Sequence, residues 1–291
     1  MKIQGTGVAL ITPFDNKGNV DYNSLKKLVN HVIDGGVDFL VVMGTTGEAV
    51  TLKAEEKKKV LDTILAENTK NLPIVLGMGS NNTQAVIENI QESDLSAVDA
   101  LLLVAPYYNK PTQEGIYQHF KAIAEHTDKD IILYNVPGRT SSNISADIVL
   151  RLANEFSHII AVKEASANFD QIMQIIKHKP TDFAVLSGDD ALTLPLISIG
   201  MDGVISVVAN VLPKQMSTMV KNAMEGDYAA AKTIHYQLLD FINNLFAEGN
   251  PAGAKAALKI LDIIEEETLR LPLVPVSETL FKELKQMTLE F

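Results

Sequence analysis

Lys163 is the residue of this sequence whose position most needs an explanation. It directly follows Ile159–Val162, a short apolar run. A lysine at the end of a buried strand is paired with an anion, extends its amine to solvent, or takes part in chemistry. Burial favours the neutral amine, which attacks a carbonyl carbon to form a Schiff base. Pairing with Glu164 or another carboxylate is the structural alternative, and the pattern alone leaves both open.

A tyrosine and an arginine follow the previous apolar run in the same way. Tyr134 ends the run Ile131–Tyr134, and its phenol is a candidate acid or base, although a strand-end tyrosine often bonds only to backbone. Arg139 follows in the turn NVPGRT and is one of three arginines in the chain. A guanidinium binds a carboxylate in bidentate geometry, so Arg139 is a candidate anion-binding residue, with an ordinary surface arginine as the alternative.

Polar groups also accompany the other apolar runs. The turn Gly44–Gly47 supplies the hydroxyls of Thr45 and Thr46 and freely oriented amides, which suit a carboxylate or an oxyanion. A plain strand-to-helix turn, in which threonine satisfies backbone groups, is the alternative. Three further runs contribute candidates at or near their ends: Tyr107 and Tyr108 in PYYNKP, Gly188 in LSGDD, and Ile205 in GVISVVAN.

These candidates share one site only if the runs that carry them are strands of a single sheet. Eight short apolar runs recur along the chain: Val8–Thr12, Phe39–Val42, Ile74–Leu76, Ala100–Val104, Ile131–Tyr134, Ile159–Val162, Ala184–Leu186 and Val204–Val208. Amphipathic segments with helical periodicity lie between them, including Ser24–Ile33, Ala54–Ala66, Thr83–Gln91, Glu114–Ala124 and Ala146–Asn154. Continuously apolar strands that alternate with helices indicate a parallel sheet covered on both faces.

Eight such units fit a closed (β/α)8 TIM barrel better than an open doubly wound sheet, which normally has fewer strands. In these barrels the functional groups lie at the carboxyl ends of the strands, which is where the candidates fall. Helical patterns follow the last strand over Met216–Met224, Tyr228–Leu245 and Pro251–Leu261. We therefore predict an α/β fold, with a barrel over residues 1–224 and a C-terminal helical appendage over residues 225–291.

Composition argues against several other kinds of protein. The chain has no cysteine, so disulfides, thiolate metal sites and a cysteine nucleophile are excluded. Its net charge of −11 disfavours a nucleic-acid or anionic-membrane surface. None of the six histidines falls at the carboxyl end of a predicted strand, so we expect no histidine-built metal site. Without a recognisable signal peptide or membrane span, the sequence predicts a cytoplasmic protein.

The chain resembles the dihydrodipicolinate synthase family, also called 4-hydroxy-tetrahydrodipicolinate synthases, over almost its full length. The resemblance rests on six motifs in matching order and spacing: GTTGE, PYYNKP, YNVPGRT, KEAS, LSGDD and GVISVVANV. The barrel and the Schiff-base lysine belong to the whole pyruvate-dependent lyase/synthase superfamily, which includes N-acetylneuraminate lyase. The arginine of YNVPGRT and the paired tyrosines of PYYNKP resemble the synthase branch more narrowly.

The resemblance implies that Lys163 forms a Schiff base with pyruvate while Tyr134 moves protons. It also implies that Thr45 and Tyr108 complete a proton relay with Tyr134, and that Tyr108 comes from a neighbouring subunit. The implied substrate-binding residues are Thr46 and Ile205 for the pyruvate carboxylate, and Arg139 and Gly188 for L-aspartate 4-semialdehyde. No metal or organic cofactor is implied, and the family pattern predicts a homo-oligomer, a tetramer built from tight dimers.

Two other functions fit parts of the same pattern. A related pyruvate lyase that acts on a sugar acid would share Lys163, but a polyhydroxylated substrate would be better served by neutral polar groups than by Arg139. A non-catalytic barrel that binds a metabolite would bind pyruvate without a covalent adduct.

Feedback inhibition by L-lysine is predicted to be weak or absent. Tyr107 and Asn81 match the interface site of lysine-sensitive relatives. Four positions differ from theirs: Ala49 replaces serine, Ala54 and Lys57 replace histidines, and Ala85 replaces glutamate. Because an anion is lost and a cation gained, less opposite charge offsets the desolvation of a lysine ammonium group. A titration of initial rate against L-lysine checks this, and strong inhibition at sub-millimolar lysine would contradict it.

Overall fold

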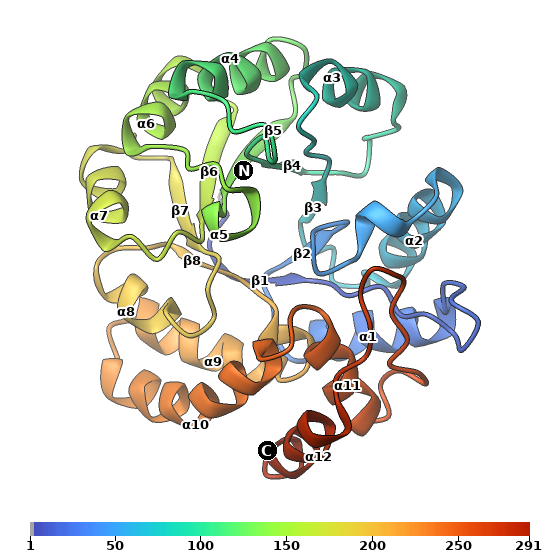
Figure 1. The fold of residues 1–291 in the computed structure, drawn as a ribbon. Helices are drawn as coiled ribbons and strands as arrows, with labels where there is room; N and C mark the ends of the chain where they lie inside the picture. The colour runs from blue at the N-terminus through green and yellow to red at the C-terminus, as the bar shows by residue number, and fades with distance from the viewer. Residues whose placement is uncertain (1–2) are drawn as a thin grey trace. The chain divides into compact units, whose positions relative to one another are not determined.

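The computed structural model describes residues 3–291 and has the strand order of a closed parallel barrel, β1 through β8 (Figure 1). The eight strands are β1 (Gly5–Ala9), β2 (Phe39–Val42), β3 (Ile74–Gly77), β4 (Ala100–Val104), β5 (Asp130–Asn135), β6 (Ile159–Glu164), β7 (Ala184–Ser187) and β8 (Gly203–Ser206). Helices separate consecutive strands, so the predicted (β/α)8 TIM-barrel class is confirmed.

The chain divides into two compact units, and the first contains residues 3–5 and 73–205. Its strands β3 to β8 pair in parallel, and their side chains are almost all buried. The helices of this unit are α3 (Thr83–Glu92), α4 (Gln113–Ala124), α5 (Pro137–Thr140), α6 (Ala146–Glu155), α7 (Phe169–His178) and α8 (Thr193–Ser198). Figure 1 shows all of them except the short helix α5 on the outside of these strands.

The second unit contains residues 6–72 and 206–291. Its helices are α1 (Tyr22–Asp34), α2 (Ala54–Glu67), α9 (Pro213–Met224), α10 (Tyr228–Phe246), α11 (Ala252–Ile260) and α12 (Glu278–Thr288), with 3-10 turns at Ala49–Thr51 and Val208–Asn210. Helix α1 packs against α2 and α9, and α10 packs against α9, α11 and α12. These contacts explain the apolar faces of the C-terminal helices.

The predicted first strand was placed too far along the chain. Val8–Thr12 was expected, but β1 is Gly5–Ala9. Its start carries two glycines in place of an apolar pattern, and a Cβ on Gly7 would come within 2.1 Å of the Phe39 ring. Beyond the strand, the Ile11 amide donates to the Asn210 side chain and not to a neighbouring strand.

The predicted eighth strand was too long at its end. Val204–Val208 was expected, whereas β8 ends at Ser206. The Ser206 hydroxyl accepts a hydrogen bond from the Ala209 amide, which favours the 3-10 turn that follows. Helix α12 was not among the predicted helices. The division at residues 224 and 225 stays a prediction, with α9 ending at Met224 and α10 beginning at Tyr228.

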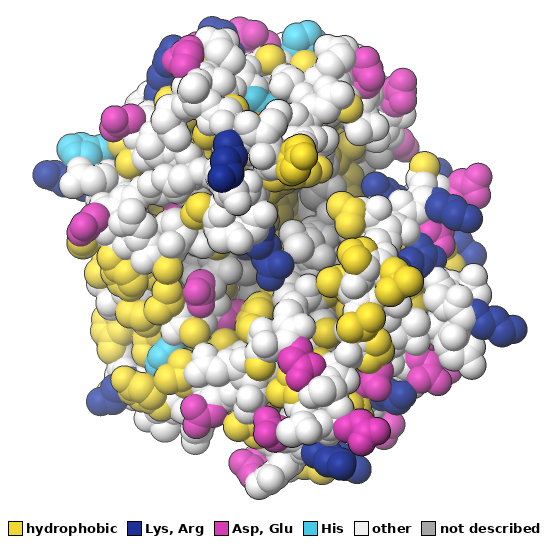
Figure 2. Space-filling view, in the orientation of Figure 1, with side chains coloured by type: hydrophobic (Ala, Val, Ile, Leu, Met, Phe, Trp, Pro, Cys, Tyr) yellow, Lys and Arg dark blue, Asp and Glu magenta, His cyan; other side chains and the backbone are white. Residues whose placement is uncertain are grey.

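No helix within residues 3–291 is both long enough and apolar enough to cross a membrane. Lys and Arg side chains lie scattered between Asp and Glu side chains on the face shown in Figure 2, without forming a broad basic surface among the residues drawn there in colour. The same described residues contain no cluster of three or more His, Cys, Asp or Glu side chains that could hold a metal ion.

His119 makes the stability of the fold sensitive to acid. It is buried on α4, where Nδ1 lies 2.9 Å from the Thr83 hydroxyl and burial lowers its pKa to about 4. An unfolded histidine titrates near 6.5, so the unfolded state binds more protons than the native state between these values. Stability is therefore expected to fall as the pH falls through this window, by up to about 3 kcal/mol.

Denaturant unfolding at several pH values between 7 and 4 checks this prediction. The variant His119→Gln keeps a polar partner for Thr83 but does not titrate, so its stability should fall less steeply with acid. His126→Gln, at an exposed position, is the matched control and should behave like the unaltered chain. Identical slopes for His119→Gln and the unaltered chain would contradict the prediction.

Candidate active site

Lys163 and Tyr134 form the centre of the candidate site in the first unit. The parallel register of β5 and β6 pairs Tyr134 with Lys163, so both side chains leave the sheet on the same face. Lys163 is 6% and Tyr134 8% exposed, and Lys163 Nζ lies 4.3 Å from the centroid of the tyrosine ring. Within residues 3–291, this contact with the ring is the one polar interaction of the Lys163 side chain. The Lys163 side chain is therefore buried, and it has no carboxylate partner among the residues that the structure describes.

Glu164 does not pair with Lys163, so the structural alternative raised by the sequence is wrong for this carboxylate. Successive residues of a strand point to opposite faces, and the buried Glu164 side chain is surrounded by other donors. It accepts hydrogen bonds from Asn135 Nδ2 at 3.0 and 3.1 Å, from Gln171 Nε2 at 3.0 Å and from the Ser166 amide at 2.8 Å. These neutral amides satisfy the carboxylate and leave the lysine free.

Gly188 lies against the side chain of Lys163. A Cβ added at this glycine would come within 3.0 Å of Lys163 Cε and 2.7 Å of Ala165 Cβ. Ile205 follows Val204 on β8, and Val204 pairs with Ser187. The structure thus brings Gly188 into contact with the lysine and places Ile205 on the adjoining strand.

Arg139 and Tyr108 lie in two loops that are joined through the backbone. Arg139 belongs to the short helix α5 and is exposed. The Tyr108 amide donates to the Thr140 carbonyl at 3.4 Å, and Tyr108 has a φ of 74° with a side chain that is 87% exposed. A large side chain seldom adopts positive φ without a reason, so the loop presents this ring outward at some cost.

The other two arginines are occupied. Arg151 pairs with Glu114 at 2.9 Å, and Arg270 binds both oxygens of Glu56 at 2.5 and 2.8 Å. The Arg270 guanidinium also lowers the pKa of Glu56 to about 2. Arg139 has no ion-pair partner among the residues that the structure describes. It is therefore the arginine that remains available to bind an anion.

Thr45 and Thr46 lie in the second unit, at the end of β2. Thr45 is exposed, whereas Thr46 is 4% exposed and accepts a hydrogen bond from Asn250 Nδ2 at 2.9 Å. The next part of the turn carries Glu48, which has a φ of 51° and forms a fully buried ion pair with Lys255 at 2.5 Å. Burial lowers the pKa of Lys255 to about 8, while Glu48 raises it and so limits the fall.

Sequence reasoning missed Asn250, Glu48 and Lys255 as partners of this turn. Glu48 is part of the GTTGE motif, and an acidic residue that close to a buried strand indicates that a positively charged partner is needed. Asn250 and Lys255 lie about 200 residues away in the chain and show no local pattern that would connect them to Thr46.

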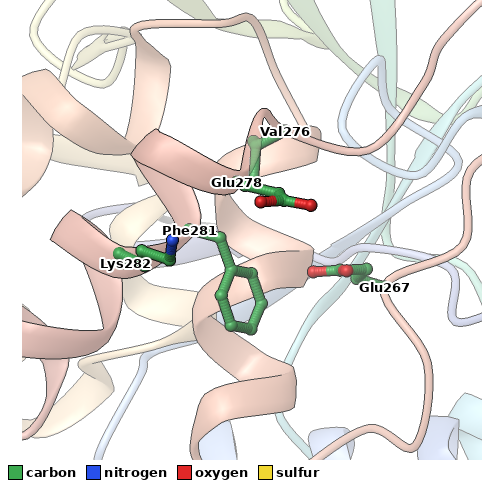
Figure 3. Close-up of a pocket in the computed structure, with 5 residues that line it drawn as sticks. All are labelled: Glu267, Val276, Glu278, Phe281 and Lys282. Atoms are coloured by element: carbon green, nitrogen blue, oxygen red, sulfur yellow. The ribbon is translucent and has the colours of Figure 1, made fainter.

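A surface pocket in the second unit does not contain any predicted site residue. It is lined by Glu267, Val276, Glu278, Phe281 and Lys282 (Figure 3). Figure 3 shows the Glu267 carboxylate directed toward the Phe281 ring, and burial raises the pKa of Glu267. This pocket is therefore separate from the candidate site around Lys163 and Tyr134.

Comparisons with known proteins agree on one family. The model of the dihydrodipicolinate synthetase family matches residues 2–290. A 4-hydroxy-tetrahydrodipicolinate synthase of Phocaeicola vulgatus is 51% identical over 284 residues, which is 98% of this chain and 95% of that protein. A dihydrodipicolinate synthase structure from Thermotoga maritima superposes with a TM-score of 0.96 at 39% identity, covering 100% of this chain and 99% of its own. The structure of the Acinetobacter baumannii dihydrodipicolinate synthase complexed with pyruvate superposes with a TM-score of 0.93 at 43% identity. The match covers 98% of this chain and 97% of that chain.

Adding one methyl group at Gly188 should disturb Lys163. In Gly188→Ala the new Cβ would displace the lysine stem or Ala165, and overpacking of this kind costs about 1–3 kcal/mol. We expect slower labelling of Lys163 by a small keto acid in the presence of borohydride, measured by peptide mass mapping. Gly138→Ala, where a Cβ meets nothing within 4 Å, is the matched control and should label normally. Equal labelling of the two variants would contradict the prediction.

Proposed function

Because the chain belongs to the dihydrodipicolinate synthetase family, we propose that Lys163 carries the family reaction as a Schiff base. That reaction is the condensation of pyruvate with L-aspartate 4-semialdehyde to 4-hydroxy-tetrahydrodipicolinate, a precursor of diaminopimelate and lysine. The observation that supports the assignment is the buried Lys163 side chain, whose amine lies over the Tyr134 ring and has no carboxylate partner within residues 3–291. A lysine amine attacks a carbonyl carbon as a nucleophile to form a Schiff base.

The chemistry follows from the Schiff base. The Lys163 amine attacks the keto carbon of pyruvate, water leaves, and the resulting iminium ion makes the pyruvate methyl group acidic. Loss of a methyl proton gives an enamine, which attacks the aldehyde carbon of the second substrate and forms the new carbon–carbon bond. The amine of that substrate then attacks the iminium carbon, displaces Lys163 and closes the ring.

Proton transfer in these steps is assigned to three hydroxyl groups. Tyr134 accepts and returns protons beside Lys163, and Thr45 and Tyr108 extend the relay. The exposed ring and positive φ of Tyr108 support a role outside its own chain. We assign it to the site of a second copy, so that activity depends on a homo-oligomer, a tetramer of tight dimers.

Both substrates carry carboxylates, and local groups must bind them because the chain as a whole is acidic. Thr46 is assigned to the pyruvate carboxylate through its hydroxyl and amide, with a backbone contact from Ile205. Arg139 is assigned to a carboxylate of L-aspartate 4-semialdehyde, for which its lack of an ion-pair partner among the described residues is the support. Gly188 leaves room beside Lys163 for the bound substrates.

The remaining features belong to the same proposal. The steps above draw on no metal or organic cofactor, because the iminium ion itself accepts the electrons. Residues 1–224 form the catalytic barrel and residues 225–291 its helical appendage. We place the enzyme in the cytoplasm, where its substrate pyruvate is available.

Trapping with borohydride tests the proposal directly. Incubation with pyruvate and borohydride should attach the reduced adduct to Lys163, because hydride reduces the iminium ion irreversibly. Lys163→Ala should lose both the adduct and most of the activity, while Lys177→Ala, which removes an exposed lysine of the same unit, should keep both. Peptide mass mapping locates the adduct, and labelling of a different lysine would refute the assignment.

A further inference from the structure

The side chain of Asn250 holds the Thr46 hydroxyl. Its Nδ2 donates to Thr46 Oγ1 over 2.9 Å, although the two residues lie 204 positions apart. Thr46 is 4% and Asn250 9% exposed, so water does not compete freely for this bond. Asn250 lies between α10 and α11, in the same compact unit as Thr46. The bond therefore joins the GTTG turn to the C-terminal helices.

A buried ion pair connects the same two segments. Lys255 Nζ lies 2.5 Å from Glu48 Oε1, and both side chains are fully buried. Lys255 also donates to the Thr268 carbonyl at 2.9 Å. Separating such a pair would leave an unpaired charge in the interior, which is strongly unfavourable. The pair therefore fixes the backbone at Glu48, two residues from Thr46. With the backbone fixed, the contact with Asn250 decides how the Thr46 hydroxyl is oriented.

The direction of the hydrogen bond matters for an anion. An amide N–H is only a donor, so the Thr46 oxygen accepts and its own hydrogen stays available. A carboxylate is only an acceptor when ionised, and it needs that hydrogen. Asn250 Oδ1 has no partner within residues 3–291, so the bond to Thr46 is the side-chain contact that orients the amide.

We propose that Asn250 is a positioning residue for pyruvate, which orients the Thr46 hydroxyl so that its hydrogen faces the substrate carboxylate. This inference rests on the role of Thr46 in the proposed function. It adds a contribution from the helical C-terminal region to substrate binding. It also assigns two different functions to that region. Lys255 supports the backbone of the turn, and Asn250 orients the Thr46 hydroxyl so that it donates toward the substrate.

A double-mutant cycle tests the proposal. Pyruvate affinity is measured as the pyruvate concentration that gives half-maximal borohydride-trapped adduct on Lys163, together with KM and kcat. Asn250→Ala should weaken affinity about tenfold with little change in kcat, because the Thr46 hydroxyl is then no longer held with its hydrogen toward the charged carboxylate. Asn250→Asp should weaken it further, because the carboxylate takes the Thr46 hydrogen and repels the substrate anion. In a Thr46→Val background, Asn250→Ala should have almost no additional effect.

Controls separate positioning from folding. Asn244→Ala removes a side-chain amide of α10, which donates to Met287 Sδ, and should leave pyruvate affinity unchanged. Asn250→Ser, which keeps a short donor, should restore part of the affinity, and melting temperatures report on folding. Additive effects of Asn250→Ala and Thr46→Val, or equal effects of Asn250→Ala and Asn250→Asp, would overturn the proposal.

Failure of the proposed function looks different in this experiment. If the unaltered chain formed no adduct on Lys163, the Schiff-base assignment itself would be wrong. If Thr46→Val bound pyruvate normally, the role of Thr46 would be wrong, and the role of Asn250 with it. If Thr46→Val weakened binding and Asn250→Ala did not, the proposal about Asn250 alone would fail.

Discussion

The parallel register between β5 and β6 determines the chemistry of the candidate site. It pairs Tyr134 with Lys163 and Asn135 with Glu164, so each pair shares one face of the sheet. In the first pair the amine of a buried lysine lies over an aromatic ring, and in the second a neutral amide binds a carboxylate. A shift of one residue would exchange the faces and bring the amine to the side where the amides lie. The side chains of Lys163 and Glu164 thus do not meet, because successive residues of a strand point to opposite faces of the sheet.

That separation explains how a lysine remains buried without an anion. Burial of Glu164 would be costly on its own, but four hydrogen bonds from Asn135, Gln171 and the Ser166 amide satisfy it. Asn143 in turn accepts from Asn135 and donates to Gln171, which fixes the amides that face the carboxylate. A network of neutral donors therefore replaces the ion pair that Lys163 would otherwise make, and the lysine is left with the tyrosine ring.

Most of the fold could be predicted because most strands are short apolar runs with a clear end. The limits of Phe39–Val42 and Ala100–Val104 agree with β2 and β4, and Lys163 and Tyr134 were identified because they stand where such runs end. The start of β1 was missed since Gly5 and Gly7 carry no hydrophobic signal, and Gly7 is required by the close approach of Phe39. Partners of the GTTGE turn could not be predicted, because the contacts of Thr46 with Asn250 and of Glu48 with Lys255 join distant segments.

The distribution of arginines shows how an acidic protein can bind anionic substrates. The net charge of −11 repels carboxylates at long range, so binding depends on cations that no acidic side chain neutralises. Glu114 pairs with Arg151 and Glu56 pairs with Arg270, while Arg139 has no such partner among the described residues. Lys255 is neutralised by Glu48 and serves the backbone of the turn. Arg139 is thus the arginine left without an acidic partner among the described residues, and it is the one to which we assign a substrate carboxylate. The neutral hydroxyl of Thr46 is proposed for the other carboxylate and adds no charge.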